Sequence, residues 1–123
     1  MKKILIADDE PAIRFLIRAT LEDQGYLLLE AADGLEAYDL ARTELPALIV
    51  LDAMMPQMSG YDLCARLKAD PVYRRIIVLM LTAKAQEEDR KVAEMAGVDY
   101  YLPKPFSPNE LTNIIRSLLT QKA

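Results

Sequence analysis

The chain has 123 residues, of which 52% are hydrophobic and 28% charged, a composition typical of one globular domain spanning residues 1–123 rather than of a disordered segment. Its 19 acidic and 15 basic side chains give a net charge of −4, which argues against direct nucleic-acid binding because such a surface needs concentrated Lys and Arg. A single cysteine and the lack of histidine exclude an internal disulfide and a Cys/His metal site.

The first apolar run, residues 4–7, is too short for a signal peptide or a membrane span, so we expect a cytoplasmic protein with no membrane contact. Further apolar runs at 26–31, 47–51, 76–81 and 99–102 alternate with segments of helical period, which predicts strands and helices around a parallel sheet. The first, third and fourth runs are nearly continuous Ile, Leu, Val and Met, as expected of central strands. The predicted fold class is α/β: a (βα)₅ doubly wound, flavodoxin-like three-layer sandwich whose five-stranded parallel sheet has the order 2-1-3-4-5.

Capping residues mark the ends of the predicted helices. Three pairs combine an N-cap acceptor with an acid three residues later, namely Asp33 with Glu36, Ser59 with Asp62 and Ser107 with Glu110. Proline suits a first helical turn, and glycine suits a left-handed cap after the last turn. These signals occur at Pro11, Pro108, Gly25 and Gly97.

Polar side chains gather where the predicted strands end. In an open parallel sheet, ligands bind at the carboxyl ends of the strands, and these ends carry Asp8, Asp9, Glu10, Asp52, Thr82 and Lys104. Taken singly, each has an ordinary reading as a helix cap, a strand residue or a solvated loop residue. Because the first and third strands are predicted neighbours, however, Asp8, Asp9 and Asp52 should share one pocket, which favours a functional site.

Three adjacent carboxylates repel one another unless a cation compensates them. Oxygen ligands without Cys or His favour Mg²⁺, which typically binds a few carboxylates together with phosphate oxygens. Lys104 would add a positive charge for a phosphoryl group and Thr82 a hydroxyl donor. Asp52, at the end of the most central strand, is the predicted nucleophile, and its product would be an acyl phosphate.

Four sequence strings resemble those of the receiver domain of two-component response regulators, the CheY-like family. They are ILIADDEP from Ile4, LDAMMPQMSG from Leu51, MLTA from Met80 and KPF from Lys104, and they occur in the family's order and spacing. The resemblance implies a signalling domain that accepts a phosphoryl group from a sensor histidine kinase or phosphotransfer protein. It implies that the chain is not an enzyme acting on other substrates and that it catalyses only its own phosphorylation and dephosphorylation.

The resemblance also implies roles for individual residues. Asp52 would be the phosphorylated aspartate, Asp9 a direct Mg²⁺ ligand and Asp8 a ligand acting largely through water. Met54 would offer its backbone carbonyl to the metal, and Thr82 and Lys104 would bind the phosphoryl oxygens. The Lys104–Pro105 bond would be cis.

A switch is implied as well. Thr82 would move toward the phosphoryl group and Tyr101 would fill the vacated space, remodelling the effector surface formed by the fourth helix, fifth strand and fifth helix. The added negative charge would drive this change.

Some positions depart from the family pattern. DNA-binding receivers of the OmpR/PhoB type often pair an Asp with an Arg across a dimer, and this chain has Tyr100 and Ile114 there. A pair of Arg90 with Glu110 leaves phosphorylation-linked homodimerisation open. Met54 and Lys84 should tune the lifetime of the phosphoryl group.

Three other functions are alternatives to a phospho-accepting receiver. A haloacid-dehalogenase-type phosphatase would need a second Asp where Met54 stands, and a flavodoxin-like cofactor site would need a Ser/Thr/Gly-rich loop in place of the acids after the first strand. A pseudo-receiver that only binds partners is a third alternative.

Cys64 is predicted to be a small buried hydrophobic residue. A stand-alone chain is favoured over the front part of a longer regulator.

Overall fold

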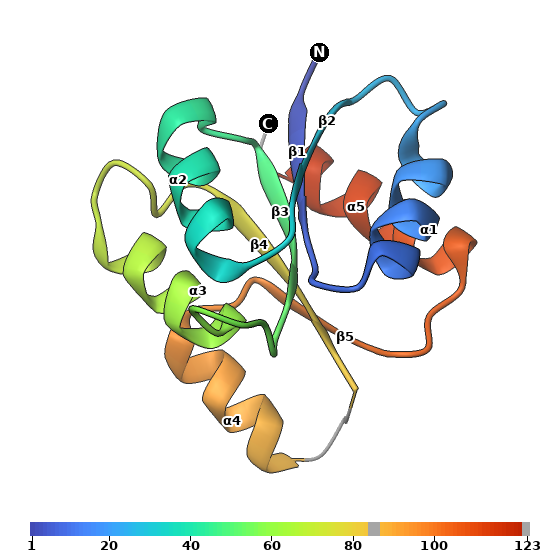
Figure 1. The fold of residues 1–123 in the computed structure, drawn as a ribbon. Helices are drawn as coiled ribbons and strands as arrows, with labels where there is room; N and C mark the ends of the chain where they lie inside the picture. The colour runs from blue at the N-terminus through green and yellow to red at the C-terminus, as the bar shows by residue number, and fades with distance from the viewer. Residues whose placement is uncertain (84–86, 122–123) are drawn as a thin grey trace.

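Five parallel strands and five helices alternate along the chain in a computed structural model that describes residues 1–83 and 87–121 (Figure 1). The sheet has the order β2-β1-β3-β4-β5, which confirms the predicted fold class and strand order. The elements are β1 Lys3–Ala7, α1 Pro11–Leu21, β2 Leu27–Ala31, α2 Gly34–Glu44, β3 Leu48–Asp52, α3 Gly60–Ala69, β4 Ile77–Thr82, α4 Glu87–Ala96, β5 Tyr100–Pro103 and α5 Pro108–Gln121.

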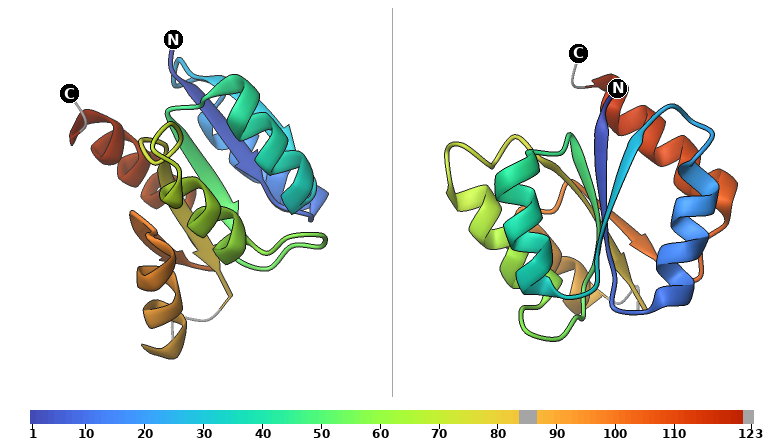
Figure 2. Two further views of the ribbon diagram at one scale, coloured as in Figure 1. Left: turned by 90° about the vertical axis from the view of Figure 1, so that its left-hand side faces the viewer. Right: turned by 45° about the horizontal axis from the view of Figure 1, so that its top comes forward.

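The sheet is the middle of three layers, with α1 and α5 on one face and α2, α3 and α4 on the other (Figure 2). Successive strand residues point to opposite faces, so Ile4 and Ile6 pack in the cluster under α1 and α5, whereas Leu5 and Ala7 pack in the other cluster. All residues of β3 and β4 are buried, as are Ile4 to Ala7 of β1. The prediction that these three strands are central is confirmed.

Most of the predicted caps form. Asp33 accepts a hydrogen bond from the Glu36 N–H (2.8 Å), and Ser59 accepts one from the Asp62 N–H (3.2 Å). Ser107 accepts one from the Glu110 N–H (3.1 Å), and Pro11 and Pro108 are the first residues of their helices. The capping prediction therefore holds at these five positions.

Of the two predicted C-terminal glycine caps, Gly97 is confirmed and Gly25 is wrong. Gly97 directly follows α4 with a φ of +88°. Gly25 has a φ of +85°, but α1 ends at Leu21 and is capped by Glu22 in right-handed helical geometry, so Gly25 serves the turn into β2 instead. Leu45, which was not predicted as a cap, ends α2 with a φ of +46°.

No helix within residues 1–83 and 87–121 has the length and apolarity that crossing a membrane requires. Cys64 is fully buried and its thiol lies 3.3 Å from the Ala96 carbonyl oxygen, as expected of a residue packed in the core. Burial raises the pKa of this thiol to about 12.

Candidate functional site

Three carboxylates meet at the carboxyl edge of the sheet. Asp8 follows the last residue of β1, and Asp52 is the last residue of β3. Because β1 and β3 are paired, with Ala7 opposite Leu51, the two acids end side by side. One oxygen atom from each of Asp8, Asp9 and Asp52 lies within 4.8 Å of the others. The structure therefore brings together the three acids that the sequence placed in one pocket.

Asp8 is the most enclosed of the three. Its side chain is fully buried, and its Oδ1 accepts a hydrogen bond from the Glu10 N–H (2.9 Å). Its own N–H donates to the Ala31 carbonyl (3.2 Å), and its Oδ2 lies 3.3 Å from Lys104 Nζ. Two of these contacts hold the Asp8 side chain and one holds its backbone, whereas the side chain of Asp9 is exposed to solvent.

Lys104 lies between two of the acids. Its Nζ is 3.3 Å from Asp8 Oδ2 and 3.4 Å from Asp52 Oδ1, and its backbone N–H donates to the Thr82 carbonyl (2.6 Å). The Lys104–Pro105 bond is cis, as the resemblance implied. Burial alone would lower the pKa of this lysine, but the two carboxylates outweigh it and raise the pKa above its ordinary value.

The surroundings of Asp52 disfavour its ionised form. Burial, and then repulsion from Asp8, raise its pKa from 3.8 to about 6, although Lys104 and the Met54 N–H act in the opposite direction. The Met54 N–H is 3.5 Å from Asp52 Oδ1, a long hydrogen bond. A carboxylate held this way would gain from a further cation, which is the behaviour of a metal ligand or nucleophile.

Thr82 and Tyr101 lie on the strands beyond Asp52. Thr82 is the buried last residue of β4, the strand next to β3, and pairs with Pro103 of β5. Tyr101 on β5 is half-buried and stands opposite Met80 of β4. Thr82 therefore belongs to the same edge as the acids, and Tyr101 lies one strand further out.

The structure says less about three other predicted participants, Met54, Lys84 and the Arg90–Glu110 pair. The Met54 side chain is exposed. Lys84 and the side chain of Arg90 lie outside the described residues, so their predicted roles are not tested. Glu110, the other member of the predicted pair, accepts a hydrogen bond from the Ser107 N–H at 3.4 Å.

The loop 53–59 after Asp52 is fastened to α2. The Gly34 N–H donates to the Pro56 carbonyl (3.2 Å). A Cβ atom at Gly34 would lie 2.0 Å from the Met58 carbonyl oxygen, so only glycine allows this approach. The first turn of α2 thereby determines where the loop beside the acids runs.

Arg14 and Glu30 are two residues near the acids that the sequence analysis missed. Arg14 Nη1 donates to the Asp8 carbonyl (2.6 Å), and Arg14 Nε lies 3.4 Å from Glu30 Oε1. A signal was present: Glu30 interrupts a leucine-rich strand, and Arg14 and Arg18 are four residues apart on one helix face. Arg18 also forms an ion pair with Glu30.

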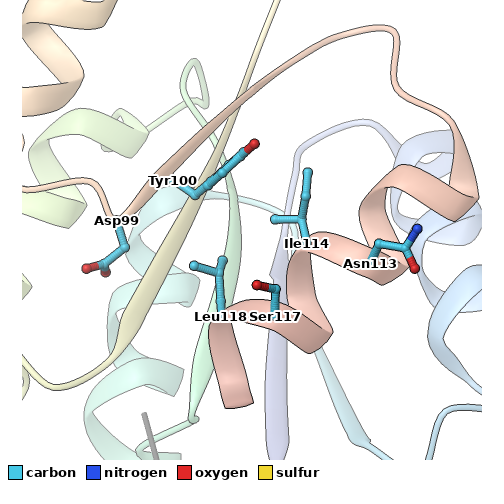
Figure 3. Close-up of a pocket in the computed structure, with 6 residues that line it drawn as sticks. All are labelled: Asp99, Tyr100, Asn113, Ile114, Ser117 and Leu118. Carbon is cyan, nitrogen blue, oxygen red and sulfur yellow. The ribbon is translucent and has the colours of Figure 1, made fainter. Parts of the chain in front are cut away.

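Two pockets lie near β5, one at each of its ends. One, of about 350 Å³, lies beside the acids and is lined by Ile13, Leu16, Ala83, Lys104, Pro105 and Phe106. Another, of about 390 Å³, lies between the start of β5 and α5 (Figure 3) and is lined by Asp99, Tyr100, Asn113, Ile114, Ser117 and Leu118. Tyr100 and Ile114, which replace the charged pair of OmpR/PhoB-type receivers, both face this second pocket.

Residues 4–116 match the family model described as the response regulator receiver domain. The chain is 42% identical over 118 residues to the alkaline phosphatase synthesis transcriptional regulatory protein PhoP of Bacillus subtilis, covering 96% of this chain and 48% of that protein. It is 43% identical over 119 residues to the DNA-binding dual master transcriptional regulator RpaA of Synechocystis, covering 97% and 49%. The chain thus spans about half the length of these curated relatives.

Solved structures of lower sequence identity share the fold. The chemotaxis protein CheY4 of Vibrio cholerae superposes with a TM-score of 0.89 at 32% identity, covering 95% of this chain and 98% of that one. The receiver domain of the Francisella response regulator 1452 gives a TM-score of 0.92 at 32% identity, with both chains fully covered.

Proposed function

Since the chain belongs to the response regulator receiver domain family of two-component systems, we propose that it accepts a phosphoryl group from a histidine kinase on Asp52, in a reaction that requires Mg²⁺. The observation that carries this proposal is the cluster of Asp8, Asp9 and Asp52 with Lys104 between two of them. Members of this family are signalling domains rather than classic enzymes, and residues 1–123 are proposed to be one such domain, working in the cytoplasm.

The residues at the site suit a hard divalent cation. Three carboxylates offer only oxygen ligands, and burial, followed by repulsion from Asp8, raises the pKa of Asp52 in spite of Lys104. Asp9 and Asp52 would hold Mg²⁺ directly, Asp8 through water, and Met54 through its carbonyl. When bound, the ion supplies charge neutralisation for the phosphoryl group.

In the transfer step, an Asp52 carboxylate oxygen attacks the phosphorus of a phosphohistidine on the donor protein. A P–O bond forms and the P–N bond breaks, and the leaving imidazole nitrogen keeps the electron pair and takes a proton from solvent. Lys104 and Thr82 bind the phosphoryl oxygens. Attack by water later releases inorganic phosphate and restores the carboxylate, at a rate tuned by Met54 and Lys84.

The output is a change of surface. Thr82 moves toward the phosphoryl group and Tyr101 fills the space it leaves, which alters the face formed by α4, β5 and α5. The pocket of Figure 3 lies between β5 and α5 on this face, and its lining, which includes Tyr100, Ile114 and Leu118, could contact a downstream effector. With Tyr100 and Ile114 in place of a charged pair, a phosphorylation-linked homodimer would need other contacts.

The donor protein needs access to Asp52, and an apolar surface adjoins it. Phe15 and Leu16 on α1 are exposed, and Leu16 and Phe106 line the pocket next to Lys104. The phosphohistidine-bearing surface of a histidine kinase or phosphotransfer protein would pack here, because this contact brings its imidazole to the acidic edge. Nucleic acid and membrane are not proposed as partners of this chain.

Labelling with a small phosphodonor tests the proposal. The protein is incubated with acetyl phosphate or phosphoramidate, with and without Mg²⁺, and its mass is measured. We expect one added phosphoryl group that requires Mg²⁺ and is lost in Asp52→Asn but kept in Asp62→Asn, an exposed acid on α3. Persistent labelling of Asp52→Asn would refute the assignment. Hydrolysis of many unrelated phosphate esters would favour a phosphatase, and no label at all would favour a pseudo-receiver.

A further inference from the structure

Arg14 contacts the proposed metal site at the backbone of Asp8, not at one of the carboxylates. Its Nη1 donates to the carbonyl oxygen of Asp8 at 2.6 Å, a short charge-assisted hydrogen bond. The Arg14 side chain is only 19% exposed, so most of it is covered by the surrounding protein. The contact links α1 to the chain directly after β1.

This hydrogen bond acts on the position of Asp9. The carbonyl of Asp8 and the N–H of Asp9 belong to one planar peptide unit, so fixing the carbonyl fixes the orientation of the unit that leads into Asp9. Asp8 is already held by buried contacts, whereas the Asp9 carboxylate is exposed. The place of Asp9 in the acid cluster therefore depends on its backbone.

Glu30 holds Arg14 in turn. Its Oε1 is 3.4 Å from Arg14 Nε, and its Oε2 pairs with Arg18. Glu30 stands opposite Ile6 in the β1–β2 pairing, close to where β1 ends. The Glu30 carboxylate on β2 thus binds the Nε of Arg14, while the Nη1 of Arg14 binds the carbonyl of the Asp8–Asp9 peptide.

We propose that Arg14 is a positioning residue for the divalent cation site, acting through the Asp8–Asp9 peptide and oriented by Glu30. This inference rests on the proposed Mg²⁺-dependent function. Arg14 itself touches neither the metal nor the phosphoryl group. Its contribution is to keep the Asp9 carboxylate within reach of Asp8 and Asp52.

Electrostatics alone predicts the opposite sign, which makes the inference testable. Removing a positive side chain near three carboxylates leaves the site more negative and should strengthen cation binding. Loss of a positioning contact should weaken it. Outer-shell partners of metal ligands typically change affinity by about 10- to 100-fold, so we expect Arg14→Met to weaken binding about tenfold.

Mn²⁺ is the probe, because it shares the oxygen preference of Mg²⁺ and its free concentration is read directly by electron paramagnetic resonance. The affinity of the full chain is compared among wild type, Arg14→Met, Arg14→Lys and Arg18→Met. Arg14→Lys keeps the charge and one donor, so it should recover part of the loss. Arg18→Met is the matched control. It removes the other positive side chain that pairs with Glu30 but leaves the hydrogen bond to the Asp8 carbonyl in place, so the Mn²⁺ affinity should stay the same or rise.

The outcomes separate the two ideas. Unchanged or tighter Mn²⁺ binding by Arg14→Met would overturn the positioning role, as would equal weakening by Arg18→Met. If wild type itself binds no Mn²⁺, the proposed metal-dependent function fails first. Should Arg14→Met fail to fold, Arg14→Gln carries the same expectation, and thermal unfolding without metal shows which variants are folded.

Discussion

Replacing the proposed phosphoacceptor with asparagine is expected to stabilise the metal-free protein near neutral pH. Ionised Asp52 sits in a buried position next to Asp8, and its pKa is raised to about 6. Asp52→Asn keeps the shape of the side chain and an oxygen acceptor for the Met54 N–H but removes the charge. The substitution should therefore relieve repulsion that the native chain tolerates.

The size of the effect follows from the pKa shift. A rise from 3.8 to about 6 is roughly two pKa units, and each unit corresponds to about 1.4 kcal/mol. The upper bound is thus about 3 kcal/mol at a pH above both values. Solvent at the open side of the site screens the charge, so we expect about 1–2 kcal/mol in the free energy of unfolding.

The sign depends on pH. Between about pH 4 and pH 6 the folded protein binds more protons at Asp52 than the unfolded chain does, so the contribution of this group to stability falls as pH rises. Below this window Asp52 is protonated in both states, and the advantage of Asp52→Asn should disappear. Above the window the advantage is complete.

Urea unfolding followed by circular dichroism, in the presence of a chelator, measures the difference across this window. Asp23→Asn, which removes a negative charge at an exposed position in the turn after α1, is the control and should not reproduce the stabilisation. If Asp52→Asn is no more stable than wild type near neutral pH, or if its advantage does not change with pH, the electrostatic account of the site is wrong.

Three further results are expected. Gly34→Ala should lower the free energy of unfolding by about 1–3 kcal/mol because its Cβ would lie 2.0 Å from the Met58 carbonyl oxygen, and thermal unfolding would show this; an unchanged melting temperature would mean that the loop is not fastened there. A chelator should leave the far-ultraviolet circular dichroism unchanged, because Lys104 already pairs with Asp8 and Asp52, and loss of helical signal would contradict this. Cys64 should resist thiol reagents in the folded state because burial raises its pKa to about 12, so labelling at the rate of a free thiol would contradict the buried position.

The fold was predictable because its signals are local. The continuous apolar runs of the inner strands and the caps at Asp33, Ser59 and Ser107 each appear within a few residues of sequence. The acid cluster was also predictable, because parallel strands end at one edge and neighbouring strands bring their ends together.

Contacts that join distant elements were only partly predictable in the same way. The sequence placed Lys104 beside the acids, as the structure has it. The hydrogen bond from Arg14 to the Asp8 carbonyl was not predicted, because it depends on how α1 is placed against β1. The end of α2 at Leu45 in left-handed geometry gave no glycine signal. Such features depend on tertiary packing rather than on local pattern.

The two outer strands of the sheet discourage assembly with strands of other molecules. At one border, β5 has four residues and ends in Pro103, which lacks an N–H for pairing. At the other border, β2 carries the charged Glu30 within an otherwise apolar strand. Short borders, proline and charge are the features by which native proteins oppose fibre-like growth, and on β2 the charged residue is Glu30, which also anchors Arg14.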